Sequence, residues 1–176
     1  VAALHPGSTP IERVTIVPHG GALGVVLREP DANQFLATRG RLLADLAVAQ
    51  GGRAAELIAF GEDGVTTGAS GDFQAATNVA RRMVTEWGMT ADPNSDLRHG
   101  WADLGQLSET GVSNGLRARI EDEIARLLRE AHARADALLR RHAEAHAKLV
   151  EALIEKETLE AAEVLDIIAA HPPAGD

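Results

Sequence analysis

The chain has 176 residues, no cysteine and a formal net charge of −9, with 26 acidic against 17 basic residues. Without cysteine it has neither disulfides nor thiolate metal sites. The acidic balance argues against a nucleic-acid surface and against adsorption to anionic lipid. No apolar run reaches the roughly 18 residues that a membrane span needs, and the length suits a single domain.

Residues 1–11 mix Ala and Leu with Pro, Gly and Ser, which predicts the end of a helix followed by a connection. The β-branched residues that follow predict a hairpin. Its first strand runs from Val14 to Val17, the next four residues supply the turn, and Ala22 to Leu27 form the second strand. We expect this hairpin to belong to a small sheet.

Three helices are expected in the next part of the chain. Apolar residues spaced by three and four predict a helix over 36–50, which the Gly51-Gly52 pair ends. A second helix runs from Arg53 to Phe60. The glycine-rich loop 61–72 then leads to a helix over 73–87, whose apolar stripe consists of Ala76, Val79, Ala80, Met83 and Val84.

The remainder of the chain is mostly helical in pattern. Residues 88–111 favour loop structure, an amphipathic stripe predicts helix from about 112 to 154, and Thr158 can cap a final short helix that reaches Ala170. The expected fold is mainly α with a small β-hairpin or sheet (α+β). We expect one domain over 1–176, with a hairpin and metal-site half (1–111) and a C-terminal helical half (112–176).

The loop GEDGVTTGASGD precedes a helix start, where backbone N–H groups attract anions such as phosphate. It has no basic residue, however, and it carries Glu62, Asp63 and Asp72, whose charges repel phosphate. We therefore exclude phosphate binding. The position of Asp72 leaves two interpretations open: an N-cap that accepts backbone hydrogen bonds, or a metal ligand at the mouth of the helix.

His142 and His146 are one helical turn apart, which is the spacing of a helical zinc pair. The order His-Ala-Glu-Ala-His differs from His-Glu-x-x-His, and Glu144 faces away from the metal that such a pair would hold. The pattern therefore favours partly exposed histidines on a helix face. Glu56 is interpreted as a charge partner of Arg53, with a carboxylate beside a functional site as the alternative.

Four segments carry a further pattern: VTIVPHGGALGVV, LLADLAVAQGGRAAELIAFGE, VTTGASGDFQAATNVARRMVTEWGM and LIEKETLEAAEV. Together they resemble the peptidase domain of the FtsH family of ATP-driven zinc proteases, over residues 1 to about 170. The resemblance implies an endopeptidase of protein substrates that forms a hexamer, is fused to an ATPase module and is anchored at the cytoplasmic side of a membrane.

The resemblance also implies specific residues. Zn²⁺ is held in that family by the two histidines of His-Glu-x-x-His and by an aspartate that corresponds to Asp72. The strand that matches Ala22, Leu23, Gly24 and Val25 lies beside the cleft and can pair with an extended substrate.

The chain departs from the family pattern where zinc is held. His-Glu-x-x-His, expected directly before VAALHPG, does not occur in these residues, nor does an ATPase module. Gly71 replaces the family's Asn, and His19 replaces its Arg. We therefore expect a soluble fragment of an active protease, without catalytic residues of its own, that binds zinc weakly or not at all and is inactive alone. The alternative is a degenerate, non-catalytic module that acts in oligomer assembly or partner binding.

Overall fold

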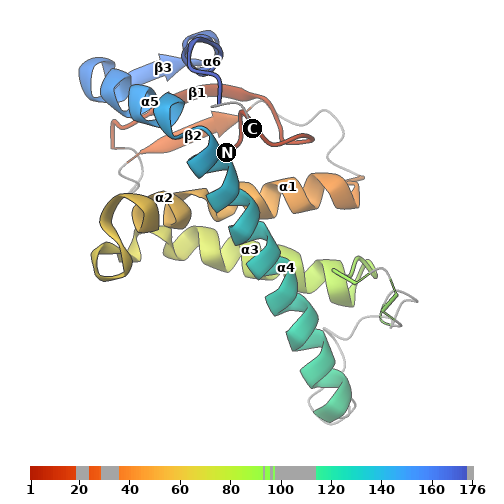
Figure 1. Ribbon diagram of the computed structural model, residues 1–176. Helices are drawn as coiled ribbons and strands as arrows, with labels where there is room; N and C mark the ends of the chain where they lie inside the picture. Colours follow the sequence, from red (N-terminus) through yellow and green to blue (C-terminus); the bar gives the residue numbers. More distant parts are fainter. Residues whose placement is uncertain (19–23, 29–35, 93, 96, 98–113, 174–176) are drawn as a thin grey trace.

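The computed structural model describes residues 1–18, 24–28, 36–92, 94, 95, 97 and 114–173. Its secondary structure is mainly helical with one small antiparallel sheet, as predicted. In Figure 1 the sheet and the two C-terminal helices form one layer, the first three helices form another, and the long helix α4 runs from the second layer to the first. Among the described residues, no helix has both the length and the hydropathy of a membrane span.

The sheet has the strand order β2-β1-β3 and is antiparallel throughout. Strand β1 (Ile11–Thr15) and strand β2 (Val25–Arg28) form the predicted hairpin. Strand β3 (Thr158–Glu160) comes from the opposite end of the sequence and pairs with β1 on its other side. Strand β2 is therefore an edge strand, and β1 is covered on both sides.

The role of Thr158 was predicted wrongly. Instead of capping the last helix, Thr158 lies in β3, where its hydroxyl is 2.9 Å from that of Thr15. The helix α6 (Ala161–Ala170) begins after Glu160, whose side chain and that of Glu163 form a reciprocal capping box. A strand of three residues carries too little periodicity to be recognised alone, because its backbone partners lie more than 140 residues away.

Helices α1 (Arg39–Ala49) and α2 (Gly51–Phe60) follow each other with only Gln50 between them. The two helices agree with the prediction, but the glycine pair does not end the first one. Gly51 and Gly52 instead open α2, because α1 already ends at Ala49 with Gln50 as its C-cap. Helix α2 stops where predicted, at Gly61, which has φ +71°.

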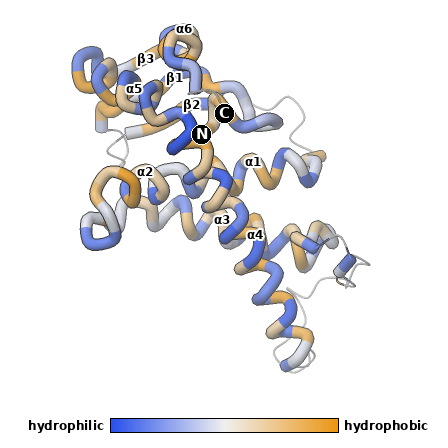
Figure 2. Tube along the Cα trace, viewed as in Figure 1, coloured by the Kyte–Doolittle hydropathy of each residue, from blue (hydrophilic) through white to orange (hydrophobic). Residues whose placement is uncertain are grey.

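Helix α3 (Ser70–Thr85) buries the predicted stripe. The predicted helix over 112–154 is divided into α4 (Asn114–Arg141) and α5 (Ala143–Lys156), with His142 at the break. Residues 112 and 113 lie outside the described residues. Figure 2 shows apolar and polar positions alternating around α3 and α4, as expected for helices with one buried face.

Two apolar clusters hold the elements together. The larger one joins α1, α3 and α4 and includes Leu43, Leu46, Ala80, Met83, Ile124 and Leu127. The smaller one lies between the sheet, α5 and α6 and is centred on Ile11, Leu159 and Val164. An ion pair between Arg28 of β2 and Asp45 of α1 (2.8 Å) connects the edge strand with the helical layer, and Asp45 also pairs with Arg41 one turn earlier in α1 (3.1 Å). The division into halves at residue 111 stays a prediction.

Candidate metal-binding carboxylate and its surroundings

Asp72 is the third residue of α3, and its side chain is exposed. It is not the N-cap, since that position is Ala69, which makes no side-chain capping bond. Within the described part of the chain, no hydrogen bond or ion pair engages the Asp72 carboxylate. A free carboxylate in the first turn is favoured by the partial positive charge of the helix N-terminus. Asp72 is therefore a charged group available for an external ligand.

The loop before Asp72 is attached to α2 by two side chains of the GGRAAE segment. Arg53 donates to the carbonyl oxygen of Thr66 at 2.7 Å, and the hydroxyl of Thr66 donates to Glu56 at 2.5 Å. The Nε atom of Arg53 lies 3.6 Å from a carboxylate oxygen of Glu56, so the predicted charge pair is present. Glu56 thus helps to hold the loop that precedes Asp72.

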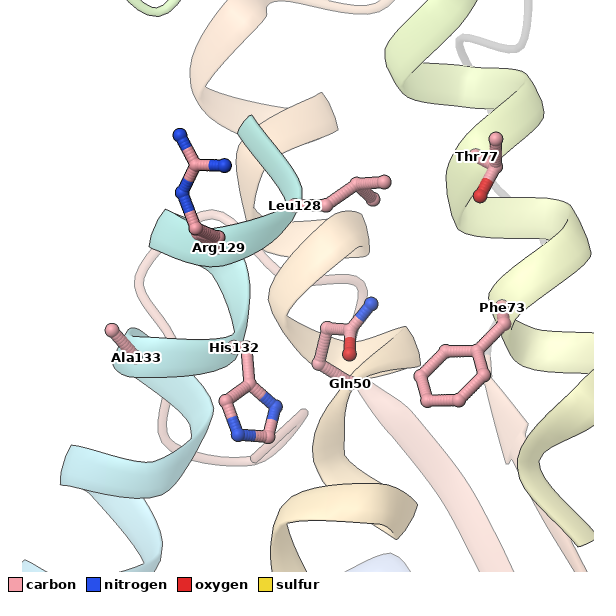
Figure 3. Close-up of a pocket in the computed structure, with 7 residues that line it drawn as sticks. All are labelled: Gln50, Phe73, Thr77, Leu128, Arg129, His132 and Ala133. Atoms are coloured by element: carbon pink, nitrogen blue, oxygen red, sulfur yellow. The ribbon is translucent and has the colours of Figure 1, made fainter. Parts of the chain in front are cut away.

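An open, mainly apolar groove of about 400 Å³ lies between α3 and α4. Phe73 and Thr77 line it from α3, and Leu128, Arg129, His132 and Ala133 line it from α4, with Gln50 at its floor. Figure 3 shows Phe73, the residue after Asp72, pointing toward Gln50 and His132. Gly51 follows the groove residue Gln50 in the sequence. A Cβ on Gly51 would lie 3.2 Å from the Val1 side chain, so Val1 packs against this residue.

No group of three or more His, Asp or Glu residues that could hold a metal occurs in the described parts of the chain. His142 and His146 do line a common cavity of about 140 Å³ against the sheet and α6. Burial lowers the pKa of His146, and the Val1 ammonium lowers it further. Both histidines are partly buried on an internal face, and Asp72 does not belong to a complete ligand set with them.

The predicted substrate strand is described only in part, because Ala22 and Leu23 lie outside the described residues. Gly24 precedes β2, and a Cβ there would approach the carbonyl oxygen of Thr15 to 2.9 Å, so glycine permits the close approach of the two strands. Val25 is the first residue of β2 and pairs with Thr15. The far edge of β2 is unpaired among the described strands.

Sequence reasoning missed Thr66 and Phe73. Thr66 caps the short 3₁₀ turn η2 (Thr67–Ala69) by accepting from the Gly68 amide at 3.1 Å. A threonine two residues before a glycine is a local turn signal that could have identified it. The contact between Phe73 and Arg53, at 5.2 Å from ring centroid to guanidinium, joins α3 to α2 and has no local signal.

Comparisons with known proteins agree on one family. The model of peptidase family M41 matches residues 1–167. The ATP-dependent zinc metalloprotease YME1L1 of Mus musculus is 44% identical over 155 residues, which are 88% of this chain and 21% of the relative. FtsH 4 of Sphaerobacter thermophilus, also named an ATP-dependent zinc metalloprotease, is 40% identical over 177 residues, which are 97% of this chain and 26% of the relative. The chain therefore spans about a fifth to a quarter of these relatives.

Proposed function

This chain belongs to peptidase family M41, and on that premise we propose that it is the peptidase part of an ATP-dependent zinc endopeptidase in which Asp72 is a zinc ligand. The exposed carboxylate at the start of α3, which has no partner in the described part of the chain, supports this assignment most directly. Carboxylate oxygen is a normal zinc ligand, and the helix that carries Asp72 packs against α1 and α4.

The described residues can supply only part of a zinc centre. A bound zinc ion would lower the pKa of a coordinated water to about 7 and polarise the peptide carbonyl. Asp72 supplies one of the three protein ligands that catalytic zinc sites have. The His-Glu-x-x-His motif does not occur in the 176 residues, so this proposal requires its two histidines and its glutamate to be supplied by further polypeptide. We propose that these residues alone are inactive.

The groove between α3 and α4 is a suitable place for that polypeptide. It is open and mainly apolar, it includes Phe73, the neighbour of Asp72, and Val1 packs against Gly51, which follows the groove residue Gln50. A helix with an apolar face would cover Phe73 and Leu128 there. Its polar ligands would then approach the Asp72 end of α3.

Substrate would bind along the segment Ala22, Leu23, Gly24 and Val25. Since β2 is an edge strand, an extended polypeptide can add to its free side through backbone hydrogen bonds, which makes binding tolerant of sequence. We further propose protein substrates, a hexameric assembly, a covalently attached ATPase module and a location at the cytoplasmic face of a membrane.

The proposal is tested on the gene product that contains these residues, purified with its bound metal. We expect about one Zn²⁺ per chain by mass spectrometry and ATP-dependent hydrolysis of casein. Asp72→Asn should lower zinc occupancy and abolish hydrolysis. Asp63→Asn changes an exposed acidic residue in the segment before α3 and should leave both unchanged. Full zinc content and activity in Asp72→Asn would refute the assignment.

The second candidate is a non-catalytic module for assembly or partner binding. The long amphipathic helix α4 (Asn114–Arg141), which can present a surface to a partner, is the feature that suggests it. A gene product that binds no zinc, shows no proteolysis and still oligomerises would support this function in place of the first.

A further inference from the structure

We infer that Arg53 is a positioning residue that fixes the segment carrying Asp72 at both of its ends. This inference rests on the proposed role of Asp72 as a zinc ligand. The segment runs from Thr66 to Phe73, and the single guanidinium of Arg53 contacts the residues at its two ends. We call Arg53, Glu56 and Thr66 the α2 clamp.

The first end is held by hydrogen bonds. The guanidinium donates to the carbonyl oxygen of Thr66 at 2.7 Å, a charge-assisted bond. The Thr66 hydroxyl donates to Glu56 and accepts from the Gly68 amide at 3.1 Å, so it couples α2 to the start of the 3₁₀ turn η2. That turn continues directly into α3 at Ser70, two residues before Asp72.

The second end is held by a cation–π contact. The Arg53 guanidinium lies 5.2 Å from the centroid of the Phe73 ring, within the range of an attractive interaction. Phe73 immediately follows Asp72, so the direction of the first turn of α3 depends on this contact. Asp72 consequently lies between two points of attachment to the same side chain.

The segment needs such external support because its own backbone is permissive. Gly68 and Gly71 both lie within it, and a Cβ at Gly71 would meet no atom within 4 Å, so local packing does not restrain that residue. Arg53 and Glu56 are only 19% and 20% exposed, and their facing Nε and Oε2 atoms lie 3.6 Å apart as an ion pair, without a hydrogen bond to any described residue. A partly buried pair of this kind is less screened by water than a surface pair.

Arginine suits this role for a geometric reason. Its planar fork can donate to a carbonyl with one nitrogen, face a carboxylate with another and present a flat surface to an aromatic ring. Lysine keeps the charge but has a single donor group, so Arg53→Lys should retain only part of the function. Zinc affinity should therefore decrease in the order wild type, Arg53→Lys, Arg53→Leu.

The experiment measures zinc affinity of the full gene product by competition with a chelator for Zn²⁺. We expect Arg53→Leu to weaken zinc binding about 10- to 100-fold, the usual range for residues that orient a ligand. Thr66→Val removes the hydroxyl that bonds Glu56 and Gly68 and should also weaken zinc binding, whereas Thr66→Ser keeps a hydroxyl and should bind zinc as the wild type does. Arg82→Leu is the matched control, because Arg82 contacts Glu86 and the Trp87 ring at the other end of α3.

A double-mutant cycle separates positioning from general destabilisation. If Arg53 acts through Asp72, then Arg53→Leu should change zinc affinity less than about threefold in an Asp72→Asn background, because coupled residues are non-additive. Equal effects of Arg53→Leu in both backgrounds, or equal losses in the Arg82 control, would overturn the inference. Unchanged zinc affinity in Asp72→Asn alone would instead refute the proposed zinc ligand, and hydrogen exchange at Gly68 would still report whether the clamp holds the loop.

Discussion

Leu127 is fully buried in α4, and its truncation measures how firmly that helix holds the helical layer. Leu127→Ala removes three carbon atoms, which at about 0.8 kcal/mol for each buried carbon costs about 2.4 kcal/mol of unfolding free energy. Helix α4 packs against α1, α2 and α3 at once, so the surrounding side chains cannot collapse freely into the space. With the remaining cavity included, we expect a total loss of about 3 to 4 kcal/mol.

The matched comparison is Leu165→Ala, the same chemical change at a residue of α6 that is 49% exposed. Because this side chain is only about half buried and no closed cavity forms, the substitution should lose about half of the burial free energy, which is about 1 kcal/mol of unfolding free energy. Urea unfolding followed by circular dichroism gives both values from the transition midpoints and slopes. Equal losses in the two variants would refute the packing of α4 against the three helices.

Three further outcomes are expected. Burial depresses the pKa of His146 below its ordinary 6.5, so the unfolded chain takes up the proton first as the pH falls, and the unfolding free energy should decrease below about pH 6.5 and level off below the folded pKa. Urea unfolding of His146→Gln at several pH values should lack this contribution. An identical pH slope in both proteins would contradict it. Glu160→Ala removes one side of the capping box and should lower the unfolding free energy by about 1 kcal/mol, whereas a change near zero would mean that the box does not stabilise α6. The 176-residue chain alone should bind Zn²⁺ weakly and substoichiometrically in equilibrium dialysis, because the Asp72 carboxylate cannot compete with water unaided; tight stoichiometric binding would direct attention to His142 and His146.

Most of the helical layer could be predicted from periodicity, because a helix buries a stripe that its own residues define. The stripe of α3 and the stop at Gly61 are examples. One error occurred where a residue's partner is distant, and another where a local signal is ambiguous. Thr158 was assigned to a helix start because its pairing with Thr15 cannot be deduced from nearby residues. Gly51 was assigned as a stop because a glycine pair is compatible with either end of a helix.

The candidate site divides in the same way. Membership of the M41 family, the choice of Asp72 as the candidate zinc ligand and the absence of His-Glu-x-x-His from these residues follow from the order of amino acids alone. That order encodes local helix signals and family motifs, so it determined which carboxylate to consider. Only the tertiary structure decided that Asp72 is exposed, that it has no partner among the described residues, and that Arg53 contacts Thr66 and Phe73 on either side of it. Those contacts join α2, the loop and α3, and side-chain geometry between separate elements has no one-dimensional signature.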